Sequence, residues 1–337
     1  MIRYFSIGIL VGAGIVVAAL LLAANLVGGA LDSQGYWPAG VIEKKTASAN
    51  RIIGPKILLV GGSNVHFGYS AEHLQAAVGM PAVNMGSQVA LGLRYLLHYS
   101  RRVIKPGDIV VLALEYQQYG DYSRKSFSAA PLVLQSLLHD REYFDSLSLL
   151  SRARIAASLS LSQWSRLIRC KLNPAIGQAH IKDYLRLKTF YDPSTTNEFG
   201  DETQNTNQIA RSIPETLFRP SRRWAVHPEA VRVLRKFSSE IRAKGASVVI
   251  AFPNLYAPAG RLPENKAFFA DLVRTAALLG LPVLGTPEEA FFDGGEMFDS
   301  TYHLTDSGRR RATERLARDL MNSGVLNGAR SLAPPTK

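Results

Sequence analysis

The chain has 337 residues and a formal net charge of +12, with 47% hydrophobic and 20% charged residues. This length suffices for one sizeable core plus an insertion. Its single cysteine, Cys170, excludes an intrachain disulfide and a cysteine-based metal site. The sequence contains no P-loop, GxGxxG or HExxH motif, and we expect neither a metal ion nor another cofactor.

The first predicted element is a transmembrane anchor over residues 1–31. No charged residue stands between Arg3 and Asp32, and about 20 apolar residues are enough to cross a bilayer. A cleaved secretory signal is the alternative, because Gly28 and Ala30 are small enough for a cleavage site. The apolar core of a signal is shorter, about 7 to 15 residues, so we favour an uncleaved anchor.

Residues 32–55 follow as a predicted tether between the anchor and a folded domain. They contain Pro38 and the polar run KKTASANR. Proline and polar residues of this kind favour a linker over a packed element. We find no candidate chemistry in this segment.

Strands and helices then alternate over residues 56–115 and again over 227–325. Such alternation predicts one α/β domain with a parallel sheet and helices on both of its faces. The predicted strands are 56–60, 82–85, 108–114, 247–252 and 282–285, and the predicted helices are 71–78, 89–103, 228–244, 264–279 and 305–321.

A glycine-rich turn after the first strand presents a candidate nucleophile. The turn reads Gly61-Gly62-Ser63-Asn64. Ligands of open α/β sheets gather outside the carboxyl ends of the strands, where glycines let the backbone bend and approach a substrate. A serine in this position can also simply cap the following helix. His66, three residues further on, is a second side chain to test.

The insertion, residues 116–226, is predicted to be largely helical. Between Ser151 and Phe190 it has eight Lys or Arg and one acid, a net +7. A solvated helix face is one interpretation. A basic amphipathic lid against anionic lipid headgroups or an acidic envelope polymer is the other. Residues 192–207 are polar enough for a mobile loop.

The loop before the last predicted helix supplies a candidate base and acid, Asp299 and His303. Histidine is the usual base that takes the proton of a serine hydroxyl, because its unperturbed pKa lies near neutrality. A carboxylate on the other ring nitrogen orients and stabilises the imidazolium. Asp293 and Asp306 are the alternative acids, and a histidine packed at a helix start is the alternative role for His303.

This layout resembles the SGNH, or GDSL-like, hydrolases over residues 56–114 and 246–320. The family's first block, Gly-Asp-Ser, corresponds here to Gly61-Gly62-Ser63, and Gly86 in VNMGSQ corresponds to the glycine of the second block. Where the third block has asparagine, this chain has Glu115-Tyr116-Gln117-Gln118. The last block has three residues between Asp and His instead of two.

The resemblance implies a three-layer α/β/α flavodoxin-like fold and a catalytic triad of Ser63, His303 and Asp299. The backbone N–H groups of Ser63 and Gly86 are the expected donors to the oxyanion of the transition state, and each such donor contributes about 3 kcal/mol. The family's asparagine is missing, so Asn64, Gln117 or Asn254 is the expected side-chain donor. No metal takes part.

The same resemblance implies where the protein works and on what. Anchored SGNH-like proteins, among them those of alginate O-acetylation and teichoic-acid D-alanylation, act beside membrane-bound O-acyltransferases. We therefore expect a single-pass protein of the cell inner membrane with its globular part on the periplasmic or extracellular side. Its expected substrate is an acyl ester, such as an O-acetyl ester, of an envelope polysaccharide or glycolipid. An exported protein rarely meets nucleic acid, so we expect no nucleic-acid partner.

Two other functions remain open from the sequence. The first is a non-catalytic SGNH-fold partner of a membrane O-acyltransferase or polysaccharide export complex, favoured by the missing asparagine and by Gly62 in place of aspartate. The second is a lipid esterase, for which the basic insertion would be the docking surface. Hydrolysis and acyl transfer share their first step, and the sequence does not separate them.

Overall fold

The computed structural model describes residues 2–120, 130–187, 191–204, 213 and 225–330. The chain divides into two compact units. The first comprises Met1–Ala39 and Phe127–Tyr191, and the second comprises Gly40–Ser126 and Asp192–Lys337. The basic part of the insertion, residues 127–191, thus forms a unit together with the amino-terminal helix. Each unit is described by itself below.

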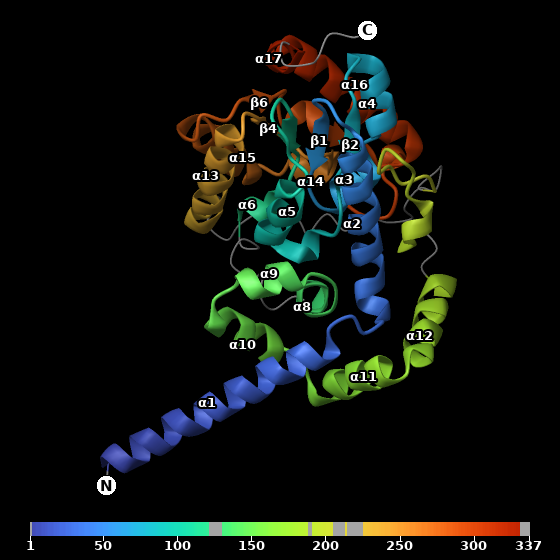
Figure 1. Ribbon diagram of the computed structural model, residues 1–337. Helices are drawn as coiled ribbons and strands as arrows, with labels where there is room; N and C mark the ends of the chain where they lie inside the picture. Colours follow the sequence, from blue (N-terminus) through green and yellow to red (C-terminus); the bar gives the residue numbers. More distant parts are fainter. Residues whose placement is uncertain (1, 121–129, 188–190, 205–212, 214–224, 331–337) are drawn as a thin grey trace. The chain divides into compact units, whose positions relative to one another are not determined.

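The second unit contains a parallel sheet of five strands in the order β2-β1-β3-β4-β6 (Figure 1). Each neighbouring pair is parallel. Because all five are short and nearly every residue in them is apolar and buried, they are typical of a parallel sheet covered on both faces. The strands are β1 (Ile57–Val60), β2 (Ala82–Asn84), β3 (Ile109–Leu112), β4 (Ser247–Ala251) and β6 (Val283–Leu284).

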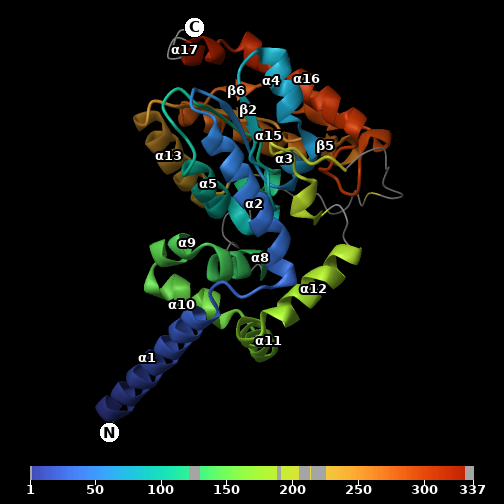
Figure 2. The ribbon, with the colours of Figure 1, turned by 45° about the vertical axis from the view of Figure 1, so that its right-hand side comes forward.

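The helices that connect or follow these strands lie close to the predicted positions. They are α4 (Ala71–Val78), α5 (Gly92–Arg101), α13 (Pro228–Ala243), α15 (Asn265–Leu278) and α16 (Asp306–Asn322). Helices α4 and α16 pack side by side, as Figures 1 and 2 both show, and α5 packs against α13. The coarse prediction of an α/β unit with a parallel sheet is therefore confirmed.

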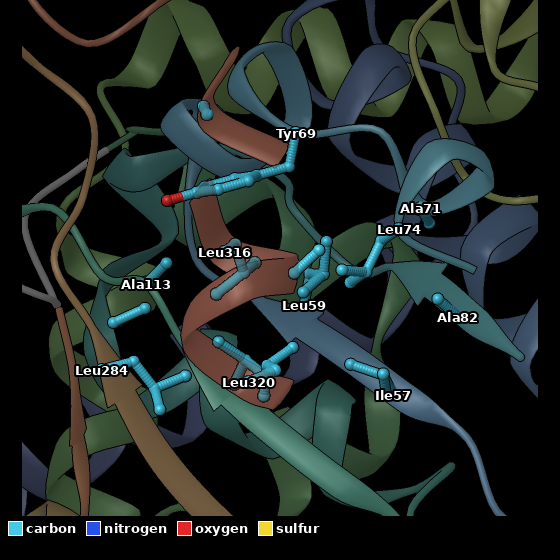
Figure 3. Packing of buried hydrophobic residues seen from close by; sticks show 14 of the residues in the cluster. Ile57, Leu59, Tyr69, Ala71, Leu74, Ala82, Ala113, Leu284, Leu316 and Leu320 are labelled. Carbon is cyan, nitrogen blue, oxygen red and sulfur yellow. The ribbon is translucent and has the colours of Figure 1, made fainter. Parts of the chain in front are cut away.

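One core of this unit lies between the sheet and the α4–α16 pair. Figure 3 shows Leu59 of β1 close to Leu316 and Leu320 of α16, with Leu74 of α4 on the other side. Tyr69 belongs to the same cluster, and all of these side chains are almost completely buried. The core thereby fixes the carboxyl end of β1, where the candidate serine follows.

Several short elements complete the second unit. A two-stranded parallel sheet pairs β5 (Leu255–Tyr256) with β7 (Phe291–Phe292). The other short helices are α3 (Ser63–Gly68), α6 (Tyr116–Tyr119), α14 (Ala257–Gly260) and α17 (Val325–Arg330), with 3-10 turns at Val89–Leu91, Pro193–Thr195, Glu288–Ala290 and Gly294–Glu296.

The segment predicted as a tether is instead helix α2 (Ser33–Arg51). Its buried residues Val41, Lys45 and Ala49 recur every four positions, so they share one face of the helix. Pro38 lies inside this helix. The spacing of the buried residues, which the polar run obscures in the sequence, explains why this segment packs as an element of the fold.

Residues 192–204, predicted as part of a mobile loop, belong to the second unit. The Asp201 carboxylate accepts hydrogen bonds from the Ser70 hydroxyl and from the N–H groups of Ala71 and Glu72, and so binds the start of α4. Both Asp201 and Glu202 are buried. Residues 205–207 of the predicted loop lie outside the described residues.

The described part of the first unit is helical, as the sequence predicts for the insertion. They are α1 (Ile2–Val27), α8 (Ala130–Leu134), a π-helical turn (Gln135–His139), α9 (Arg141–Ser146), α10 (Leu149–Ala157), α11 (Leu161–Leu172) and α12 (Pro174–Leu187). A separate core joins the carboxyl-terminal end of α1 to α10 and α11.

In the described part of the chain, no helix combines the length and the hydropathy that a bilayer crossing requires. Helix α1 occupies most of the segment that the sequence assigns to an anchor. The anchor over residues 1–31 stays a prediction from the sequence.

Candidate active site

Ser63 begins helix α3 directly after strand β1. The turn before it, Gly61-Gly62, leads the chain from the carboxyl end of the strand into the helix, and every residue of α3 is buried. Only 9% of the Ser63 surface is exposed. The serine therefore lies where the resemblance places it, at the carboxyl edge of the sheet.

Glu115, which follows β3, holds the backbone on both sides of Ser63. Its two carboxylate oxygens accept hydrogen bonds from the N–H groups of Gly62 and Asn64, each at 3.1 Å. A Cβ atom at position 62 would collide with this carboxylate. Gly62 is thus required because the carboxylate occupies the space beside it.

The environment of the Glu115 carboxylate has opposing effects on its pKa. Burial raises the pKa, whereas the N–H donors of Asn64 and Gly62 lower it, and the net direction is upward. The charge of the His303 ring also lowers this pKa, by a smaller amount.

Asp299 and His303 are joined directly. Asp299 Oδ1 lies 2.5 Å from His303 Nδ1. The loop that carries them is closed by a bridge between Met297 and Leu304, which supports the predicted turn over Ser300–Tyr302. The alternative acid Asp306 pairs instead with Arg309 and Arg310, at 2.6 and 3.0 Å.

His303 packs on the same face of α3 as Ser63. Its ring centroid lies 4.6 Å from that of Phe67. Because Phe67 follows Ser63 by four residues in a helix, the two side chains share one face, a turn apart. Asp299 binds Nδ1, so Nε2 is the nitrogen left for proton transfer. Ser63 and His303, which are both described, form no hydrogen bond with one another. Catalytic hydrogen bonds are often formed only when substrate is bound.

The predicted oxyanion donors differ in what they bind. The Gly86 N–H donates to Asn84 Oδ1 at 2.9 Å, and the Asn64 side-chain amide donates to the Ala113 carbonyl at 2.7 Å. The Asn254 amide donates to the Gly68 carbonyl at 3.1 Å. Gln117 Oε1 accepts from the Tyr302 hydroxyl at 2.8 Å, so its side chain is tied to the His303 loop.

The Ser63 N–H binds no other described residue. It is the first N–H of α3, and a first N–H has no partner within its own helix. This group is the clearest oxyanion donor of the site. At position 86 a glycine is needed because a Cβ atom there would meet the backbone of Val65 and His66, in helix α3.

A buried polar cluster that the sequence did not predict contacts α3. Lys45 Nζ donates to Asn84 Oδ1 at 3.1 Å, and His66 Nε2 lies 3.4 Å from Glu202 Oε2. Asn84 also donates to the carbonyls of Val65 and Tyr69. Asn84 therefore links helix α2, helix α3 and the turn at Gly86.

Burial dominates the charges of this cluster. It lowers the pKa of Lys45 to about 7, against the opposing pull of Asp201 and Glu202. Burial and the nearby Lys45 lower the pKa of His66 to about 4. At neutral pH His66 is therefore uncharged, and a pKa this far below the working pH makes it a weak proton acceptor, which suits a supporting group better than a second base. The four-residue spacing of Val41, Lys45 and Ala49 is the sequence signal that could have revealed Lys45.

No group of three His, Cys, Asp or Glu side chains in the described ranges is arranged to hold a metal ion. Comparisons of the chain with protein-family models, with curated proteins and with solved structures give no match. The geometry of the site and the resemblance of its motifs are therefore what indicate a function.

Proposed function

We propose that this protein is a membrane-anchored SGNH-like serine esterase or O-acyltransferase. The observation that carries the proposal is the Asp299–His303 pair, whose imidazole packs on the helix that Ser63 begins. Ser63 precedes the Asp299–His303 pair by about 240 positions in the chain. Acyl transfer through a covalent intermediate requires a serine as nucleophile, a histidine as its base and a carboxylate that orients the histidine.

The topology supports a three-layer flavodoxin-like fold. In chain order the five strands are arranged 2-1-3-4-5, the order of flavodoxin-like sheets. In that order the switch point lies between β1 and β3, and ligands of such sheets bind there. Ser63 follows the first of these strands and Glu115 the second.

In the proposed reaction, His303 Nε2 takes the proton of the Ser63 hydroxyl as its oxygen attacks the carbonyl carbon of an ester. Asp299 orients the ring and stabilises the imidazolium. The Ser63 N–H donates to the oxyanion. The protonated His303 then gives its proton to the departing alkoxide, which leaves an acyl-serine. Water or a sugar hydroxyl attacks that intermediate with His303 again as base.

Substrate, partner and location rest on the resemblance. We assign the substrate to acyl esters, in particular O-acetyl esters, of an envelope polysaccharide or glycolipid. Residues 1–31 would hold the protein in the inner membrane as a single span, with the α/β unit on the periplasmic or extracellular side. A membrane-bound O-acyltransferase is the proposed partner.

Labelling with a fluorophosphonate probe tests the enzyme. We expect the probe to mark Ser63 in the full chain and to be lost in both Ser63→Ala and His303→Ala. Thermal unfolding of each variant shows whether it remains folded. A folded wild-type protein that takes up no probe, and releases no acetate from acetylated sugars, would exclude the esterase.

The non-catalytic partner is the second candidate, and a specific observation favours it. The Gly86 N–H and the amides of Asn64 and Asn254 are all engaged within the fold. The oxyanion would then have one backbone donor. Each donor stabilises the transition state by about 3 kcal/mol, so a site with one donor would be slow. Release of fatty acid in place of acetate would identify the lipid esterase.

A further inference from the structure

Helix α11 carries an exposed apolar stripe. Leu161, Ile168 and Leu172 are 88%, 41% and 80% exposed. Their separations of seven and four residues put all three side chains on one face of the helix. Single exposed leucines are common on protein surfaces, but a row along one helix face marks an interaction surface.

The other face of α11 already packs into the first unit. Trp164, Leu167 and Cys170 are buried, and the first two share a core with Ala24 and Val27 at the end of α1. Figures 1 and 2 show α11 beside that end of α1. The helix is therefore apolar on two faces, and the folding of its unit requires only one of them.

Cations flank the exposed stripe. On a helical wheel, Arg169 and Lys171 lie about 80° to either side of it. Lys171 donates to the Gly28 carbonyl at 2.5 Å, which holds this side of α11 against the residues that follow α1. No acidic residue occurs within Leu161–Leu172. An apolar stripe between cationic borders is the pattern of a helix that lies in a membrane interface.

The neighbouring helices repeat this combination. Helix α10 begins with the exposed Leu149 and Leu150 and carries two arginines, and α12 ends with Leu187, which is 82% exposed. A groove of about 570 Å³ along α12 combines apolar and cationic residues in the same way; it is lined by Tyr36, Gln178, Ile181, Lys182, Leu185 and Arg186.

We propose that α11 lies in the headgroup region of an anionic bilayer, with Leu161, Ile168 and Leu172 inserted between the lipids. An acidic polysaccharide would match the cations but offers no apolar phase for the leucines. A second copy of the chain would cover the leucines but bring like charges together. An anionic bilayer satisfies both features.

This proposal adds the position of α11 to the proposed function. It takes the membrane anchor over residues 1–31 from that proposed function. If residues 1–31 cross the membrane, the chain leaves the bilayer near Val27, next to the buried face of α11. The helix would then lie at the level of the headgroups. The membrane contact would position the first unit as well as tether it.

Fluorescence from a single labelled cysteine in the full chain tests the proposal. The sole native cysteine is removed as Cys170→Ser, and an environment-sensitive dye is attached at Leu161→Cys. The matched control is Leu278→Cys, at a leucine of the α/β unit that is 78% exposed. In vesicles with one third phosphatidylglycerol, we expect a blue shift at position 161 and at least twofold stronger quenching by lipid-borne quenchers than at position 278.

Charge and occupant are tested with the same dye. Arg169→Glu should reduce the quenching at position 161 at least twofold, whereas Arg235→Glu, at an exposed site of the α/β unit, should not. Equal dye spectra at positions 161 and 278 in anionic vesicles would overturn the proposal. So would a dye shift at position 161 that requires no lipid and rises with protein concentration, because it would identify a second copy as the occupant.

The outcome is separable from that of the proposed enzyme. Fluorophosphonate labelling of Ser63 reports the active site and does not depend on α11. Flotation of the protein with vesicles in both dye variants reports the anchor. A protein that floats and labels normally, but shows no lipid contact at position 161, would disprove the docking alone.

Discussion

At the residue scale, two of the three departures from the motif of the SGNH hydrolases that this chain resembles lie close together in space. The family's first block has aspartate where this chain has Gly62, and the third block has asparagine near the position of Glu115. In the structure the Glu115 carboxylate binds the N–H groups on both sides of Ser63, and it fills the space that a side chain at position 62 would need. A carboxylate therefore lies beside the serine, and it is supplied by the residue that follows β3.

This exchange predicts an energetic coupling between positions 62 and 115. Gly62→Asp alone should destabilise the protein by about 1–3 kcal/mol, because the new side chain collides with a buried carboxylate. Glu115→Asn alone should cost about 1–3 kcal/mol through the loss of an acceptor for two buried N–H groups. The double variant should be less destabilised than the sum, by about 1–3 kcal/mol. Free energies of unfolding in urea measure all three.

Gly54→Asp is the control for this cycle. A Cβ atom at position 54 meets nothing within 4 Å, so Gly54→Asp and Glu115→Asn should be additive to within about 0.5 kcal/mol. Additivity of Gly62→Asp with Glu115→Asn would contradict the exchange. The sequence alone could not reveal this pair, since the two residues are 53 positions apart and neither matches the motif.

At the scale of elements, the sequence predicts the parts of the fold that depend on local pattern. Short apolar runs that alternate with amphipathic stretches predict the strands and helices around the sheet to within a few residues, as β1 and α4 illustrate. Helix α3 was missed because its Gly-Gly-Ser-Asn start is typical of a turn. Helix α2 was missed because Pro38 and a polar run hide its buried face.

Lys45 provides a test that residues 40–51 of α2 are an integral part of the second unit. Its pKa is about 7 in the folded protein, against the ordinary value of 10.5. Between these values the unfolded chain binds a proton that the folded chain does not, so stability rises with pH over this window. Lys45→Met removes the titrating group. The unfolding free energy of the wild type relative to this variant should increase by on the order of 3 kcal/mol between pH 7 and pH 10.

Lys44→Met is the matched control, because Lys44 is the exposed neighbour and donates only to the carbonyls of Ser194 and Thr196. The stability of Lys44→Met should follow that of the wild type over the same pH range. A Lys45→Met variant whose pH dependence equals that of the wild type would show that the ammonium is not buried among Asn84, Asp201 and Glu202.

At the scale of the whole molecule, the candidate chemistry and the basic surface belong to different units. Ser63, Asp299 and His303 all lie in the α/β unit, whereas α10, α11 and α12 lie in the helical unit. Each unit has its own hydrophobic core. The sequence predicts a helical, basic insertion, but not that residues 1–39 would join it, because that association depends on contacts between distant segments.

Separate cores predict that damage to one unit need not loosen the other. Leu167 of α11 is fully buried in the helical core, and Leu167→Ala should cost that unit about 2–5 kcal/mol through a cavity. Hydrogen exchange should then accelerate in peptides from α10 and α11 but not in those from β1 and β3. Leu316→Ala, in the core of the α/β unit, should show the opposite pattern. If Leu167→Ala instead accelerates exchange in β1 and β3 as strongly as in α11, the two units unfold as one, and an active site in the α/β unit would depend directly on the stability of the helices proposed to dock on the membrane.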